Sequence, residues 1–387
     1  MKRHLLCCVL FLSLAASSCL VQAQAHKPKK GQHIPHASQR ELIAFVSAHT
    51  GHDEIFVIGT DGKGLKPITK GNEASHDPHW SPDRRYIAFT RGGGEGADAY
   101  VIHPDGTGLK RLTQSKFYTA CEGWLPRGEP ILIHRESCPS GYYTIDVDGT
   151  HLKRVSTEWA SADWTPNGKH TVFAKPVTKE EDDPRSEVWL GDSKLKQARQ
   201  ITHFAASSSN PLWSPDGSRF VFVTEYGRRK GVYVYNRNTN KLKRVLDTDS
   251  LDCQGTPLWL PNGQQLAFMG SYKAFEGHKT DIGDSLILPN GQSLPAFYLV
   301  TKATRTAKND NQIHVMNSDG TRLRCLTNYW GGVDSIMCTR DGRIIFESAL
   351  ASDVGGVMNN LWGLHIINTD GTGFRTLWTE PKRKAKP

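Results

Sequence analysis

The stretch Asn210–Thr224 reads NPLWSPDGSRFVFVT: a tryptophan stands before a Ser-Pro-Asp-Gly turn, and an alternating run of Phe and Val follows. Asp and Gly suit tight hairpin turns because they tolerate positive φ angles. Apolar alternation with a period of two is typical of a strand with one buried face. The stretch therefore predicts a β-hairpin, with the tryptophan as a core aromatic residue.

The same pattern recurs through the chain, with a second motif between its copies that ends in Asp-Gly-Thr and a short strand. The Asp-Gly turns at Asp61, Asp105 and Asp148 are 44 and 43 residues apart. Each unit supplies four strands, named A to D, with the quoted turn between A and B. Repeated four-stranded units predict an all-β fold, a single β-propeller of four-stranded antiparallel blades. Seven blades are expected, with six as the alternative because strand A of the first unit is poor. The further copies are ASQRELIAFVS (37–47), DPHWSPDRRYIAFT (77–90), EGWLPRGEPILIHR (122–135), SADWTPNGKHTVFAK (161–175), TPLWLPNGQQLAFMG (256–270) and SIMCTRDGRIIFES (335–348).

The two motifs, W-[ST]-P-[DN]-G-x-x-[IVL]-A-F and [IV]-x-V-[MI]-x-x-D-G-T-x-x-x-x-L-T, together resemble the TolB-type propeller repeat over nearly all of residues 41–380. The resemblance implies an exported propeller that binds partner proteins of the cell envelope. The chain differs from TolB in having seven units instead of six. The α/β domain that precedes the propeller in TolB is also expected to be absent.

The N-terminus has the pattern of a secretory signal: Lys2 and Arg3, an apolar run from Leu5 to Ala16, and small residues up to Ala23. Lipidation at Cys19 is an alternative, although the residues before it make a poor lipobox. No apolar run is long enough to span a bilayer, so a periplasmic or secreted monomer is expected. The predicted divisions are a signal peptide (1–23), a basic disordered linker (24–40), the propeller (41–380) and a basic tail (381–387).

The net charge of +9 comes from the ends of the chain. Once Lys2, Arg3 and the cations of residues 27–30 and 382–386 are set aside, basic and acidic residues are equal in number. A neutral body does not attract polyanions over a distance, so nucleic acid is not an expected partner.

Blade geometry places the loops and therefore the expected site. The A–B and C–D turns lie on one face, here the turn face, and the B–C loops and D–A links lie on the other, here the mouth face. The long insertions 176–186, 271–309 and 351–360 all fall on the mouth face, and loops on a rigid scaffold often bind ligands. The polar D–A links can also serve merely as strand caps. The expected binding residues around the channel mouth are His76, Asp77, Tyr118, Glu122, Asp163, Asn210, Gln254, Trp330 and Asp334.

Five cysteines follow the predicted signal. Cys121 and Cys138 both fall on the mouth face of the third unit, which makes a disulfide between them plausible. Cys325 is expected on an outer strand D and Cys338 on an inner strand A, too far apart for a bridge. Cys338 is therefore predicted to be a buried thiol.

Chemical motifs are weak by comparison. Gly283-Asp284-Ser285-Leu286 spells the nucleophile block of a lipase-esterase family, but the α/β context and the later Asp and His that it needs are missing. No cofactor or metal site is predicted, although a divalent ion in the channel mouth is possible, with His76 and His278 as ligands. A non-enzymatic scaffold for an envelope protein or peptide, or for a saccharide, is the favoured function. The alternative is a metal-dependent lyase or hydrolase for acidic oligosaccharides, similar to oligogalacturonate lyases.

Overall fold

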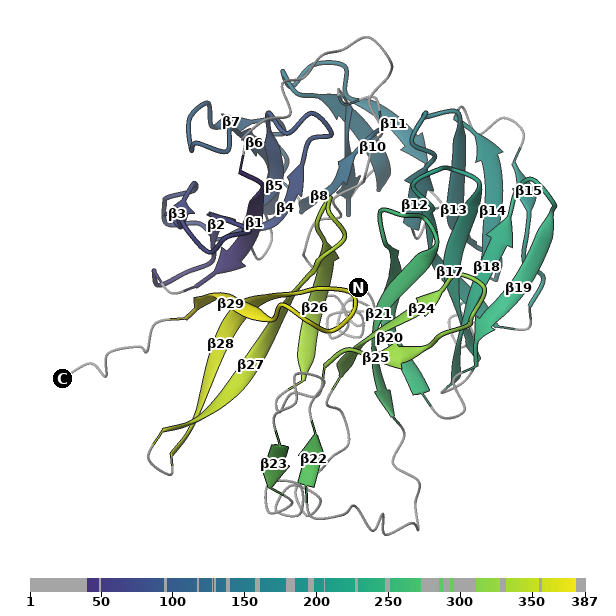
Figure 1. Cartoon of the computed structure of the whole chain (residues 1–387). Helices are drawn as coiled ribbons and strands as arrows, with labels where there is room; N and C mark the ends of the chain where they lie inside the picture. The colour runs from purple at the N-terminus through teal and green to yellow at the C-terminus, as the bar shows by residue number, and fades with distance from the viewer. Residues whose placement is uncertain are drawn as a thin grey trace, which may run out of the picture.

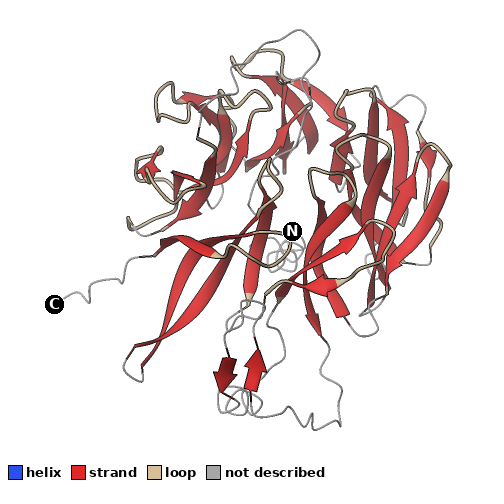
Figure 2. Cartoon of the chain, in the orientation of Figure 1, coloured by secondary structure: helices blue, strands red, loops and turns tan. Residues whose placement is uncertain are grey.

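The computed structural model describes residues 40–380, apart from 49, 94–95, 117, 127, 129, 137–139, 157–160, 179–184, 194–197, 205, 227–228, 248–250, 273–284, 288–292, 296–310, 328–331 and 355–356. Within these residues the secondary structure is β-strand throughout, and no α-helix occurs (Figure 2).

Seven sheets form the blades, and the strands within each sheet follow chain order. Blades 1 to 3 consist of β1 (Leu42–Ser47), β2 (Glu54–Gly59) and β3 (Lys66–Pro67); β4 (Ser75–Trp80), β5 (Ile87–Gly93), β6 (Gly96–Ile102) and β7 (Lys110–Arg111); and β8 (Thr119–Trp124), β9 (Pro130–Arg135), β10 (Gly141–Asp146) and β11 (Lys153–Ser156). Blades 4 and 5 consist of β12 (Ser161–Trp164), β13 (His170–Pro176), β14 (Ser186–Asp192) and β15 (Arg199–Gln200); and β16 (Ser207–Trp213), β17 (Arg219–Tyr226), β18 (Arg229–Asn236) and β19 (Lys241–Leu246). Blades 6 and 7 consist of β20 (Leu251–Trp259), β21 (Gln265–Tyr272), β24 (Gln312–Asn317) and β25 (Arg324–Cys325); and β26 (Val333–Cys338), β27 (Ile344–Val354), β28 (Val357–Ile367) and β29 (Arg375–Thr379).

The blades stand around a ring, with the last blade beside the first (Figure 1). Blades 2 to 7 have the expected strands A to D in antiparallel order, which confirms the seven-bladed propeller. In blade 1 the described strands are B, C and D. A separate hairpin, β22 (Ser285–Ile287) with β23 (Ser293–Pro295), lies in the blade 6 insertion.

The Asp-Gly-Thr motif is explained by its hydrogen bonds. Asp105 Oδ1 accepts hydrogen bonds from the Thr107 amide at 2.9 Å and the Thr107 hydroxyl at 2.6 Å, while Gly106 adopts a φ of +83°. These bonds to Thr107 lower the pKa of the Asp105 carboxyl. The motif therefore closes a hairpin locally, which is why it repeats. The same Asp–Thr pairing occurs at Asp148–Thr150, Asp319–Thr321 and Asp370–Thr372.

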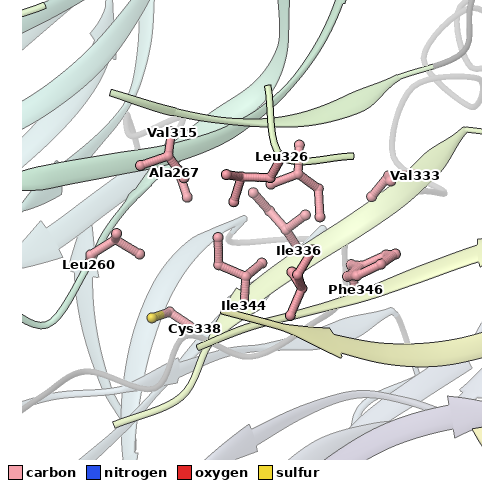
Figure 3. Close-up of a cluster of buried hydrophobic side chains, with 11 residues drawn as sticks. Leu260, Ala267, Val315, Leu326, Val333, Ile336, Cys338, Ile344 and Phe346 are labelled. Carbon is pink, nitrogen blue, oxygen red and sulfur yellow. The ribbon is translucent and has the colours of Figure 1, made fainter. Parts of the chain in front are cut away.

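The hydrophobic core is divided among the blade interfaces. Seven clusters of buried side chains occur in the described residues, one between each pair of neighbouring blades. Figure 3 shows the cluster between blades 6 and 7, where Cys338 packs beside Ile344. Cys338 is buried, as predicted. Burial raises the pKa of its thiol to about 12. The strand assignments that separate Cys325 from Cys338 are also confirmed.

Basic side chains on the outer strands form hydrogen bonds with the C–D turn of the next blade. Lys243 Nζ on β19 donates to the Asp319 carbonyl at 2.8 Å, and Arg324 Nη2 on β25 donates to the Thr369 carbonyl at 2.7 Å. Lys66 donates in the same way to the Asp105 carbonyl. The basic residue that follows Leu or Phe in the second motif is thus a link between blades.

Candidate functional site

The innermost strands are irregular where they reach the channel mouth. Strand A carries a register shift in blades 2, 3, 5, 6 and 7. Asp77 in β4 and Asn210 in β16 each stand three residues before a tryptophan and adopt positive φ angles of 55° and 52°. Asp and Asn tolerate this conformation, and a bulge takes a residue out of the ladder. The bulges therefore place polar residues at the mouth.

His76 and Asp77 form a pair at the head of blade 2. His76 Nδ1 lies 2.8 Å from Asp77 Oδ2, and His76 Nε2 lies 3.4 Å from the Gly92 carbonyl. The hydrogen bond to Asp77 is the main reason that the pKa of His76 is raised. Both side chains are about a quarter exposed, so a ligand in the channel can reach them.

Glu122 approaches this pair from blade 3. Its side chain is exposed and forms no hydrogen bond or ion pair within the described part of the chain. Desolvation by the surrounding protein nevertheless raises the pKa of Glu122 to about 7, and the negative charge of Asp77 adds to this effect. A carboxyl group that lines a narrow channel can be both exposed and desolvated. Solvent reaches it, while the surrounding protein displaces bulk water. The charge of Asp77 in blade 2 thus acts on Glu122 in blade 3.

A second acidic pair lies in blade 7. Asp334 is half-buried, and desolvation raises its pKa. Glu347 on β27 accepts a hydrogen bond from Ser335 Oγ at 3.0 Å. Burial raises the pKa of Glu347 to about 7, with a contribution from the Asp334 charge.

Sequence reasoning missed Glu347. The available signal was a carboxylate in the run Ile344-Ile345-Phe346-Glu347, because the other blades hold no carboxylate at this place of strand B. Their residues there are Val46, Thr90, His134, Ala174, Val223 and Met269.

Three other expected residues have contacts within the scaffold. Asp163 is 8% exposed, and its two oxygens accept hydrogen bonds from the backbone amides of Trp164 at 2.8 Å and Trp213 at 2.7 Å. Gln254 Nε2 donates to Asp252 at 2.7 Å. The Tyr118 carbonyl accepts from the Glu136 amide at 3.2 Å. We therefore leave Asp163 out of the proposed site.

The remaining expected residues divide between exposed and undescribed positions. Asn210 has an exposed side chain, and its amide donates to Ser161 Oγ at 3.1 Å. Trp330, Cys138 and His278 lie outside the described residues, as does most of the 271–309 insertion. Cys121 is buried and has no disulfide to a described residue, so its pairing with Cys138 stays a prediction.

The described positions offer neither a metal-ligand group nor a membrane-spanning helix. They hold no group of three or more His, Cys, Asp or Glu placed to bind a metal ion. They also include no helix long and apolar enough to cross a membrane.

Comparison with known proteins identifies the fold. No family model matches the chain. A protein of Bacillus subtilis (strain 168) named uncharacterized peptidase YuxL is 24% identical over 176 residues, which span 44% of this chain and 26% of that protein. The chain thus matches about a quarter of the length of this relative.

Several solved structures share the architecture. An oligogalacturonate lyase of Vibrio parahaemolyticus has a TM-score of 0.56 at 12% identity, covering 88% of this chain and 87% of its own. The propeller domain of the Trilobed protease from Pyrococcus furiosus is described as having an open velcro topology. It has a TM-score of 0.58 at 11% identity, and the match covers 88% of this chain and 93% of that domain. A putative TolB of Agrobacterium tumefaciens has a TM-score of 0.46 at 16% identity and covers 70% and 84%. In its fold, this chain is a seven-bladed β-propeller.

Proposed function

We propose that the protein is a non-enzymatic binding scaffold that holds a cationic segment of a partner protein or peptide at the mouth of its channel. The observation that carries this proposal is that desolvation disfavours the charge of Glu122, near Asp77, and of Asp334 and Glu347 in blade 7, so that a cation beside these groups would stabilise their ionised forms.

The electrostatics favour a positively charged ligand. Desolvation disfavours the ionised form of a carboxyl group, and an opposite charge within a few ångströms restores it. A Lys or Arg side chain entering the mouth would therefore be attracted to Glu122, and its binding would lower the pKa of that group. An anionic ligand would meet repulsion instead.

We further propose that the scaffold acts outside the cytoplasm, in the periplasm or as a secreted protein. The basic, apolar and small-residue segments of 1–23 support this location. Sequencing the N-terminus of the mature protein from its own host would test it. A mature chain that begins at Met1 would refute export by this signal.

Binding to a fluorescent decalysine peptide, followed by fluorescence anisotropy at pH 8, tests the scaffold proposal. Asp77→Asn with Glu122→Gln should weaken binding at least about tenfold, since two charge contacts are each worth roughly 1 kcal/mol at a partly exposed site. Asp247→Asn is the matched control, because Asp247 is an exposed partner of Arg244. Equal weakening by the control would show that only overall charge matters.

The alternative function is a metal-dependent lyase or hydrolase acting on acidic oligosaccharides. The observation in its favour is the seven-bladed fold shared with oligogalacturonate lyase. The described residues hold no group of three such donors placed to bind a metal ion, so this alternative rests on the shared fold alone. A stoichiometric divalent metal in the purified protein, with depolymerisation of oligogalacturonate, would replace the scaffold proposal with this one.

A further inference from the structure

A pair of facing residues on strands B and C is repeated in every blade. In six blades Phe on strand B pairs with an aromatic ring on strand C, and in blade 3 Ile133 pairs with Tyr143. In blades 6 and 7 the partner on strand C is a histidine. The six pairs are Phe45–Phe56, Phe89–Tyr100, Phe173–Trp189, Phe222–Tyr233, Phe268–His314 and Phe346–His365.

His365 is completely buried among aromatic rings. Its ring centroid lies 5.2 Å from that of Phe346 and 5.6 Å from that of Phe374. Nδ1 lies 3.1 Å from Thr376 Oγ1, whereas Nε2 is buried without a hydrogen-bond partner. Burial lowers the pKa of His365 to about 4, and the Ser348 carbonyl opposes this only in part.

His314 occupies the equivalent place in blade 6. It is also 0% exposed, stacks on Phe268 with 5.4 Å between centroids, and lies 3.1 Å from the Gln312 carbonyl through Nδ1. Burial lowers the pKa of His314. The titratable group opposite it on β25 is the Cys325 thiol, whose own pKa is raised by burial.

No carboxylate is placed to stabilise a His365 imidazolium within the described residues. Glu347 on β27 pairs with Leu364 and alternates to the face away from His365. Arg375 on β29 pairs with Ile366, also on the other face, and Arg324 of blade 6 is bonded to the Thr369 carbonyl. A proton added to His365 would therefore be a buried charge with no counter-ion.

We propose that His365 is an acid-sensitive latch: protonation of its ring loosens the packing of blade 7 against blade 6. The location gives the latch its effect. His365 packs on Phe346, which belongs to the buried cluster between blades 6 and 7, so loss of this packing weakens the contact of the last blade with blade 6.

The direction of the pH effect follows from proton linkage. The unfolded chain binds a proton at His365 near pH 6.5, whereas the native chain does so only near pH 4. The contribution of neutral His365 to stability is therefore complete above pH 6.5 and is lost as the pH falls toward 4. This histidine alone should raise the unfolding equilibrium constant about 100-fold between pH 7 and pH 4.

Urea unfolding of the full chain and of His365→Phe from pH 4 to pH 7.5 tests the latch. The variant should keep the wild-type stability at pH 7.5 within a factor of ten and lose about 100-fold less stability at pH 4. His203→Phe, the same change at an exposed histidine, should leave the pH profile of the wild type unchanged. His365→Tyr is the second variant if Phe does not fold, because Tyr100 and Tyr233 occupy the equivalent place.

Two further measurements locate the part of the ring that loosens in acid. An NMR titration of His365 should show a pKa well below 6.5, and a pulse of pepsin at pH 4.5 should cut blades 6 and 7 first, less so in His365→Phe. A His365 that titrates near 6.5, or a His365→Phe profile parallel to that of the wild type, would overturn the latch.

Discussion

Arg375 Nη2 on the last strand donates a hydrogen bond of 3.2 Å to the carbonyl oxygen of Thr60, 315 residues earlier in the chain. The ring thus closes with the same link that joins its interior blades, where Lys243 and Arg324 bind the next C–D turn. Blade 7 also donates from the Arg340 amide to Glu41 Oε1 at 3.1 Å. In the described residues no strand is shared between the first and last blades, so side-chain packing and these polar contacts hold the closure.

Replacing Arg375 with Ala should lower the free energy of unfolding by about 1 kcal/mol, since a partly buried hydrogen bond has a modest net value. Thermal unfolding checks this. Arg324→Ala, which removes the corresponding link between blades 6 and 7, is the matched control. A loss several times larger for Arg375→Ala would show that closure depends on this one contact.

Asp163 should act on stability, because its carboxylate accepts two buried backbone amides from neighbouring blades. Asp163→Ala leaves both amides without a partner and should cost about 2–4 kcal/mol. Denaturant unfolding measures this cost. Asn210→Gly, at an exposed mouth position where glycine tolerates the positive φ, should cost far less. If Asp163→Ala lost peptide binding but kept its stability, Asp163 would belong to the binding site after all.

Glu347 should make the protein less stable at alkaline pH. The pKa of its carboxyl is about 7 in the folded chain against an ordinary value of 4.5, so the native state binds more protons between these pH values. Stability from this group is complete below pH 4.5 and is lost as the pH rises through 7. Glu347→Gln should therefore raise the unfolding free energy by about 1–2 kcal/mol at pH 8, after allowance for solvent screening, and little at pH 4. If Glu347→Gln changed the unfolding free energy equally at pH 8 and pH 4, the raised pKa of Glu347 would be contradicted.

Affinity for a cationic peptide should rise with pH as Glu122 ionises. The pKa of Glu122 is about 7, so the proportion of the carboxylate grows between pH 6 and pH 8. Anisotropy titrations should show binding about fivefold tighter at pH 8 than at pH 6, and Glu122→Gln should flatten this dependence. A flat profile in the wild type would place the peptide elsewhere.

The predicted disulfide between Cys121 and Cys138 can be mapped on the mature protein without reduction. We expect a peptide that joins the two residues, and Cys338 as a thiol that alkylates only after unfolding, because burial raises its pKa to about 12. Alkylation of Cys138 in the native protein would exclude the bridge. Cys121 would then be an inert buried thiol, since burial and nearby carboxylates raise its pKa as well.

The blade was predictable because its information is local. The Ser214-Pro215-Asp216-Gly217 turn, for example, is held by a bond from Ser214 Oγ to Asp216 Oδ1 at 2.5 Å, two residues away. The site was predictable only in part. The sequence placed Asp77 and Glu122 on one face, but it also proposed Asp163, whose bond to the Trp213 amide joins residues of two blades and cannot be recognised from either motif.

The amino-acid sequence by itself determined the strands, their hairpins and their number, because turn chemistry and two-residue alternation act between near neighbours in the chain. Only the tertiary structure decided which polar groups meet. Contacts between blades join residues that are distant in the chain, as in the bond from Trp124 Nε1 to the His79 carbonyl, 45 positions away. Whether a carboxylate such as Glu347 or an imidazole such as His365 is buried without a counter-ion depends on the neighbouring blade, and that arrangement exists only when the ring is assembled.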